Sequence, residues 1–208
     1  MKRTLSLVLS ATLAPAAFAG VYTESGDAHE LVPQPVVGTN PITAIQGALS
    51  AASNDYADLF SIYISNPAAF SASTVGGATF DTQLFLFDAD GRGVSHNDDA
   101  PGGGSLQSRL TGAFVPGPGV YWLAISPYNR DPSSGFGLIW NNSPFNTERA
   151  PDGPGAASAL LSWAGTGTTG SYTIELTGVV AVPAPGPLLL AALGGLLVTR
   201  RVRTSPTR

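Results

Sequence analysis

The chain has 208 residues, a formal net charge of −4 at pH 7, 25 glycines, 17 prolines and no cysteine. The absence of cysteine excludes a disulfide framework and a thiolate metal site, so stability has to come from a packed core or from bound ions. Between residues 20 and 181 the only lysines or arginines are four arginines, against all 14 acidic residues, and this balance excludes binding of nucleic acid through a basic patch.

Residues 1–19 have the pattern of a secretory signal peptide. Lys2 and Arg3 precede an apolar stretch, and Ala17-Phe18-Ala19 is a small-residue cleavage pattern. A buried amino-terminal helix is the alternative, but nothing after Gly20 continues a helical period. We therefore expect an exported protein that signal peptidase cleaves after this motif.

The next segment, 20–41, is polar and contains prolines, and it is predicted to be a flexible lead-in. From residue 42 to residue 178 the apolar side chains alternate with a period of two, and glycine and proline divide the chain into short pieces. The strongest strand patterns lie at 58–65, 83–87, 120–126 and 171–177. Weaker ones lie near 45–49, 70–75, 110–115 and 159–163. This pattern predicts an all-β fold with two antiparallel sheets packed as a sandwich.

Acidic and amide side chains are densest in the turns that flank the predicted strand 83–87. Ca²⁺ takes about six to eight oxygen ligands, and carboxylates brought together on loops repel one another unless a cation joins them. We therefore predict a calcium site whose candidate ligands are Asp81, Asp88, Asp90, Asn97, Asp98 and Asp99. The alternative is that Asp90-Gly91 makes a hairpin turn and that residues 97–99 cap the glycine-rich loop that follows.

A long segment, 131–155, is rich in Pro, Gly, Asn and Ser. Segments of this length are either functional or disordered. Exposed aromatic rings can stack on sugar faces, so the candidate ligand contacts in and beside this segment are Tyr128, Trp140 and Phe145. Core packing is the alternative role for Trp140.

Catalytic motifs are missing from the sequence. It has neither a Gly-x-Ser-x-Gly elbow nor a His-Glu-x-x-His helix, and its two histidines, His29 and His96, stand apart. Asp98 and Asp99 are adjacent and cannot flank a glycosidic bond from two sides. The sequence therefore favours a protein that is not an enzyme.

The order of the strands and acidic turns resembles the bacterial pre-peptidase C-terminal domain over residues 42–178. The segments that carry the resemblance are 47–49, 55, 58–62, 81–88, 97–99, 119–125 and 170–176. The resemblance implies a β-sandwich of the jelly-roll type with a role in accessory binding or packing rather than in catalysis. The long 131–155 segment is a departure from that pattern.

Residues 179–208 have the pattern of a sorting tail. A proline motif at 182–186 precedes an uncharged segment at 187–199, predicted to be an apolar helix, and a basic end at 200–208. At about 1.5 Å per residue the apolar segment is too short for a hydrocarbon core of roughly 30 Å, so membrane insertion is expected to be transient. The arginines are expected to stay on the cytoplasmic side.

This tail resembles the PEP-CTERM sorting signal, with Val182, Pro183, Ala184 and Pro185 at the motif and Ala184 where that family usually has glutamate. The resemblance implies cleavage at the motif by an exosortase-type membrane protease. We expect a protein of the cell surface or extracellular matrix with a structural or adhesive role and with exopolysaccharide as a partner. A calcium-dependent glycan-binding module is the alternative.

Overall fold

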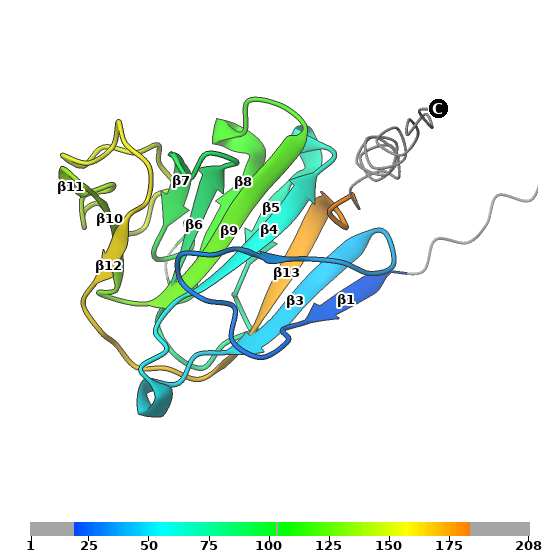
Figure 1. Cartoon of the computed structure of the whole chain (residues 1–208), viewed down its shortest axis with the longest axis horizontal. Coiled ribbons are helices and arrows are strands. Elements are labelled where there is room, and N and C mark those ends of the chain that lie inside the picture. Colours follow the sequence, from blue (N-terminus) through cyan, green and yellow to red (C-terminus); the bar gives the residue numbers. More distant parts are fainter. Residues whose placement is uncertain (1–18, 103, 184–208) are drawn as a thin grey trace, which may run out of the picture.

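In this computed structural model the described residues are 19–102 and 104–183, and they form an all-β fold with two sheets (Figure 1). Residues 1–18 of the predicted signal peptide and the apolar and basic parts of the predicted tail lie outside the described residues. Within the described ranges, no helix has the length and apolar character needed to cross a membrane.

The large sheet has ten strands. They are β1 (Gly20–Thr23), β2 (Gln34–Pro35), β3 (Ile42–Ala48), β4 (Asp58–Ile64), β5 (Ser71–Ser73), β6 (Thr82–Asp88), β7 (Gly93–Asn97), β8 (Arg109–Thr111), β9 (Gly119–Pro127) and β13 (Ser171–Val180). Seven of them follow the order β1-β3-β13-β4-β9-β6-β7, while β2 pairs with β4 and β5 joins β13 to β8.

The smaller sheet has the order β11-β10-β12 and lies at the left of Figure 1. Its strands are β10 (Asp131–Ser134), β11 (Gly137–Leu138) and β12 (Ser162–Ala164). Three short 3-10 helices complete the described elements: η1 (Ala51–Ser53), η2 (Pro67–Ala69) and η3 (Gly112–Phe114).

Strand β13 joins the two halves of the large sheet. It pairs with β3 and then with β5, and its last residues, Val179 and Val180, pair with β4. The register with β3 shifts just before Val179, next to Gly178, whose φ is +71°. A Cβ at Gly178 would lie 2.6 Å from the carbonyl oxygen of Asn66. Glycine is therefore needed where one strand passes from one partner to the next.

The inner core lies between the β4–β9–β6 part and the β3–β13–β5–β8 part of the large sheet. Phe60, Ile62 and Ile64 of β4 are fully buried, as the period of two predicts, and they belong to one cluster with Ile45 and Ile174. Because side chains from both parts meet in this single cluster, the all-β sandwich prediction is confirmed.

The outer face of β6 and β9 is covered by the insertion, which we define as residues 131–164. Phe85 and Phe87 of β6 form a second buried cluster with Ile139, Trp140 and Trp163 from the insertion. The ring centroids of Phe85 and Phe87 each lie 5.5 Å from that of Trp140. The predicted long loop is therefore a folded cover, which explains why the β6 sequence is apolar on both faces.

Residues 20–41 are packed onto the sandwich, so the prediction of a flexible lead-in is wrong. Strands β1 and β2 pair in parallel with β3 and β4, respectively, and Ala28 and Val36 are buried. These two parallel pairs also differ from the predicted antiparallel sheets. Backbone hydrogen bonds fix this segment, such as the one from the Leu59 amide to the Ala28 carbonyl at 2.9 Å, and a polar sequence carries no periodic signal for them.

The packing of Trp140 predicts a large effect of truncation. Its side chain is only 3% exposed, so Trp140→Ala should lower the free energy of unfolding by about 3 to 5 kcal/mol. Phe136→Ala is the control, because Phe136 is 76% exposed and should change stability by about 0.5 kcal/mol or less. Urea unfolding measures both, and equally small effects would contradict a packed insertion.

Candidate functional site

A fully buried carboxyl group, that of Asp58, stands at the first position of β4. Its Oδ2 accepts a hydrogen bond of 2.6 Å from the hydroxyl of Tyr172 on β13. Its Oδ1 has no hydrogen-bond partner among the described residues. An unpaired buried polar atom costs about 1–3 kcal/mol, which indicates that a further group belongs beside this oxygen.

Two carboxylates from the N-terminal segment, those of Glu24 and Asp27, lie close to the Asp58 carboxyl group. One oxygen each of Glu24, Asp27 and Asp58 lie within 4.8 Å of one another. Oxygens that share a calcium ion at about 2.3–2.6 Å are at most about 5 Å apart, so this spacing fits one cation. We call this group the N-terminal cluster.

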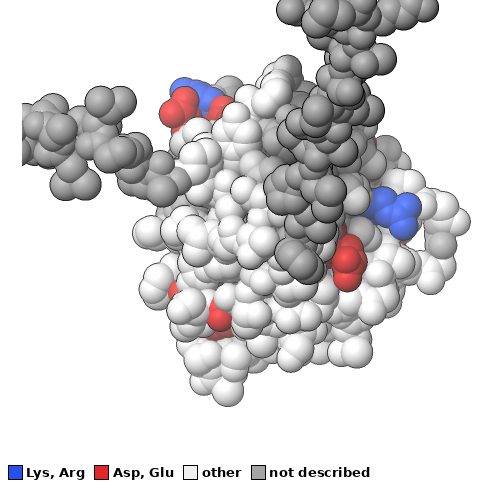
Figure 2. All heavy atoms as spheres, turned by 90° about the vertical axis from the view of Figure 1, so that its right-hand side faces the viewer, with Lys and Arg blue, Asp and Glu red and all other residues white. Residues whose placement is uncertain are grey.

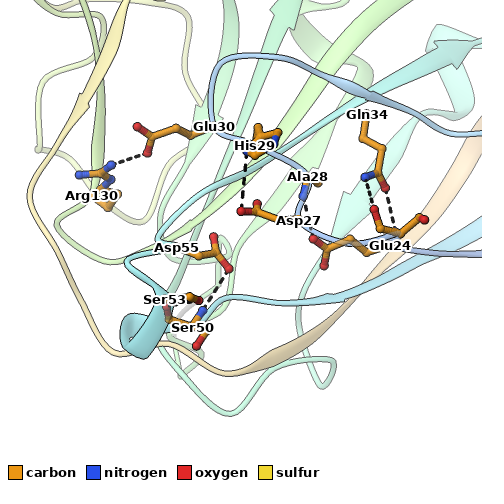
Figure 3. Close-up of polar contacts among 11 residues, drawn as sticks. Glu24, Asp27, Ala28, His29, Glu30, Gln34, Ser50, Ser53, Asp55 and Arg130 are labelled. Atoms are coloured by element: carbon orange, nitrogen blue, oxygen red, sulfur yellow. Dashed lines mark hydrogen bonds and ion pairs between the residues drawn. The ribbon is translucent and has the colours of Figure 1, made fainter.

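The position of Glu24 is fixed by backbone donors on both sides. Its Oε1 accepts from the Ala28 amide at 2.9 Å, as Figure 3 shows, and its Oε2 accepts from the Ala48 amide at 3.1 Å. Glu24 therefore links the N-terminal segment to the end of β3 and presents its carboxylate to the cluster in a defined orientation.

A pocket opens beside the N-terminal cluster, lined by Asp27, His29, Glu30, Asn54, Asp55, Tyr56 and Ala57. At its edge Glu30 pairs with the guanidinium of Arg130, as Figure 3 shows. The indole Nε1 of Trp163 donates to the Glu30 carbonyl at 2.7 Å. The indole contact ties the N-terminal segment to the insertion, and the ion pair ties it to Arg130, the residue just before the insertion. The charge of Arg130 is therefore paired with Glu30.

Burial, with neighbouring negative charges as a smaller cause, disfavours ionisation of the carboxyl groups in this region. Burial raises the pKa of Asp58 to about 8, and the charges of Glu24, Asp55 and Asp27 add to the rise, while the hydrogen bond from Tyr172 opposes it. Burial also raises the pKa of Asp55 to about 6, again with help from Asp27. A carboxyl group in this position holds a proton or requires a cation.

The structure brings together three of the six residues predicted to bind calcium. One oxygen each of Asp81, Asp98 and Asp99 lie within 4.8 Å of one another, and we call them the hairpin cluster. Asp81 precedes β6 while Asp98 and Asp99 follow β7, and the antiparallel pairing of Leu84 with Asn97 makes these ends adjacent.

Burial is also the main cause of the raised pKa values in the hairpin cluster. It raises the pKa of Asp98 to about 7, with further contributions from the charges of Asp81, Asp99 and Asp131, while Arg149 opposes the rise. The pKa of Asp81 rises to about 6 for the same reasons, burial first and then the charge of Asp99.

The other three predicted ligands have different roles. The Asn97 side chain donates to the Asp99 carbonyl at 2.7 Å and accepts from the Arg109 amide at 2.8 Å. Oδ1 of Asp88 accepts from the amides of Asp90 and Arg92, both at 2.9 Å, in the turn between β6 and β7. This turn is at the far end of β6, about 20 Å along the strand from Asp81, so Asp88 and Asp90 are outside the cluster.

The three aromatic candidates also separate. Trp140 is buried against β6, so it is a core residue and is not presented to a ligand. Tyr128 and Phe145 are exposed at 54% and 52%, respectively.

Within the sorting motif, the Val182 amide donates to the Val36 carbonyl at 2.9 Å and Pro183 is exposed, while Ala184 and Pro185 lie outside the described residues.

Glu24, Asp27 and Asp58 were not among the ligands predicted from the sequence. One signal for Asp58 is present in the sequence. Side chains alternate along a strand, so Asp58 lies on the same face of β4 as the buried residues Phe60 and Ile62 and is an acidic residue at a core position. Glu24 and Asp27 carry no such signal, because only the fold brings the N-terminal segment to the start of β4.

Comparisons with known proteins give no guide to the site: no protein-family model, curated protein or solved structure matches the chain. The chemistry of the clusters is thus the available basis for a functional interpretation. Both are formed by carboxylate oxygens, which are ligands for hard cations such as Ca²⁺ and Mg²⁺.

The raised pKa of Asp58 predicts how the stability of the metal-free protein depends on pH. The folded-state pKa of about 8 exceeds the ordinary value of 3.8, so the folded state binds more protons than the unfolded state between these pH values. The contribution of Asp58 is fully present below the ordinary pKa and is lost as pH rises through the folded-state pKa.

Asp58→Asn should remove this part of the pH dependence, because an amide keeps an acceptor for Tyr172 and does not ionise. Urea unfolding in the presence of a chelator, at several pH values between about 4 and 8, measures the slope for the parent and the variant. Identical slopes would contradict the assignment of a raised pKa to Asp58.

Proposed function

We propose that this chain is an exported, non-catalytic β-sandwich protein of the cell surface or extracellular matrix, with a structural or adhesive role, and that Ca²⁺ at the N-terminal cluster stabilises it. One observation carries the proposal: the fully buried Asp58 has a carboxylate oxygen without a partner among the described residues, beside two further carboxylates. A divalent cation satisfies that oxygen and removes the repulsion among the three groups.

Calcium suits this cluster better than softer metals do. The three side chains offer only carboxylate oxygens, which favours hard cations. Extracellular calcium modules bind with dissociation constants of about 10⁻⁴–10⁻³ M, so three carboxylates completed by water are sufficient for an exported protein. Occupancy would then depend on the calcium concentration outside the cell.

The position of the N-terminal cluster supports a structural role. The segment 24–30 is bonded to β3 through Glu24, to β4 through Ala28 and to the insertion through Glu30. A cation at Glu24, Asp27 and Asp58 strengthens the junction at which these three parts meet. In a chain without cysteine, such a junction supplies the cross-link that a disulfide supplies elsewhere.

The distribution of charged side chains on the surface favours a binding partner that carries little charge. On the face drawn in Figure 2, charged side chains are few and scattered among neutral ones. Electrostatic steering of a polyanion needs a continuous basic surface, so a neutral polysaccharide or a neighbouring matrix protein suits that face better.

Two resemblances extend the proposal. The segments that carry the resemblance to pre-peptidase C-terminal domains include β4, β6, β9 and β13, which supply most of the inner core, and this supports a jelly-roll sandwich of that kind. Delivery would use a PEP-CTERM-like tail and an exosortase-type protease. Pro183 is exposed and directly follows Val182, whose amide donates to the Val36 carbonyl of the domain, and this supports access to the motif.

Calcium should raise the thermal stability of the full chain. A ligand present at about 100 times its dissociation constant stabilises the native state by about 2.7 kcal/mol. Asp27→Asn should reduce the gain, since Asp27 is exposed and its replacement removes a ligand without disturbing the core. Asp90→Asn, in the distant turn, is the matched control. Melting curves of the parent that coincide in calcium and in chelator would overturn the proposal.

Sorting has a separate test. The double variant Pro183→Leu, Pro185→Leu should leave a longer form in the membrane of the producing cell, because the protease loses its motif and the apolar segment gains length. Pro206→Leu, beyond the motif, is the control. Mass spectrometry of the mature protein measures the carboxyl terminus, and equal trimming of the double variant and the control would argue against cleavage at the motif.

A further inference from the structure

The hairpin cluster has no part in the function proposed above, although one of its members is as unusual as Asp58. Asp98 is only 4% exposed, and its Oδ1 has no hydrogen-bond partner among the described residues. The buried Oδ1 of Asp81 also has none within the described part of the chain. Two orphaned oxygens therefore lie in one group of three carboxylates whose ligand atoms are within 4.8 Å of one another.

The side chains around the cluster do not neutralise it. Arg149 donates to the carbonyls of Ser143 and Asn141 and pairs with Asp152 at 3.2 Å. Asp131 adds a fourth negative charge near Asp98, and its own oxygens accept from amide side chains. The guanidinium bonds point Arg149 toward the insertion backbone and leave the carboxylates of the hairpin cluster without a cationic partner among the described residues.

The cluster also lies where the insertion crosses the end of the β6–β7 hairpin. The Asp99 amide donates to the Phe145 carbonyl at 3.0 Å, and His96 and Arg149 exchange two backbone hydrogen bonds of 3.0 Å. On the other side of the cluster, the Tyr128 amide donates to the Asp81 carbonyl at 2.9 Å. Anything that draws Asp81, Asp98 and Asp99 together therefore also orders the backbone around residues 143–149.

We propose that Asp81, Asp98 and Asp99 form a second divalent-cation site, specific for a hard ion such as Ca²⁺, and that this ion fixes the insertion over the end of the β6–β7 hairpin. The ion satisfies both orphaned oxygens and is held by three carboxylates, with water completing its coordination. The site is independent of the N-terminal cluster, because it shares no residue with that cluster and lies at the ends of two other strands, β6 and β7.

Calcium titration of the full chain by isothermal calorimetry, after treatment with a chelator, tests this site. Loss of a group that only orients a ligand weakens metal binding by about 10- to 100-fold, so loss of a direct ligand should weaken it by at least about tenfold. Asp98→Asn and Asp99→Asn should each bind one calcium ion fewer than the parent under conditions that saturate the parent. Asp90→Asn carries the same charge change at the other end of β6 and should bind as the parent does.

Two features keep the test decisive. Asp99 is only half-buried, so Asp99→Asn remains informative if Asp98→Asn fails to fold. Calcium should also slow amide hydrogen exchange over residues 143–149 in the parent and in Asp27→Asn, but not in Asp99→Asn. Loss of binding in Asp27→Asn alone would overturn the second site and leave the N-terminal cluster intact, whereas loss in Asp99→Asn alone would support the second site and count against the first.

Discussion

Burial of the Asp58 carboxyl group at the start of β4 constrains the beginning and the end of the domain together. Tyr172, near the start of β13, donates to one oxygen of this group, and the next residue of β4, Leu59, donates its amide to Ala28 in the N-terminal segment. The second oxygen has no hydrogen-bond partner among the described residues, and an oxygen of this carboxyl group lies within 4.8 Å of one oxygen each of Glu24 and Asp27. Because a buried carboxyl group must hold a proton or a cation, the packing of the N-terminal segment is linked to the charge state of Asp58.

A related constraint explains the shape of the rest of the molecule. Strand β6 is apolar on both faces, with Leu84 and Leu86 in the inner core and Phe85 and Phe87 in the outer cluster. A sheet with two apolar faces must be covered on both sides, and the insertion provides the second cover. The N-terminal segment and the insertion are thus both additions to a central sandwich, and each meets it beside a cluster of three acidic groups of which one is buried.

The sequence predicted the parts of the fold that depend on alternation. The four strongest strand patterns correspond to β4, β6, β9 and β13, because apolar side chains repeat there with a period of two. The prediction of a flexible segment at 20–41 is wrong because backbone hydrogen bonds and a few buried residues hold this segment against the sandwich, and neither gives a periodic pattern in the sequence. Of the predicted calcium ligands, Asp81, Asp98 and Asp99 come together because antiparallel pairing joins their strand ends. The N-terminal cluster depends on long-range pairing, which local sequence does not encode.

We propose that a cation occupies the space between Glu24, Asp27 and Asp58. A crystal structure of the protein grown with calcium, with anomalous scattering to identify the ion, would show whether it does. We expect an anomalous peak within about 2.3–2.6 Å of a carboxylate oxygen from each of these three residues. An Asp58 carboxyl group that stays hydrogen-bonded to Tyr172 in millimolar calcium, with only water or no density beside its Oδ1, would contradict it.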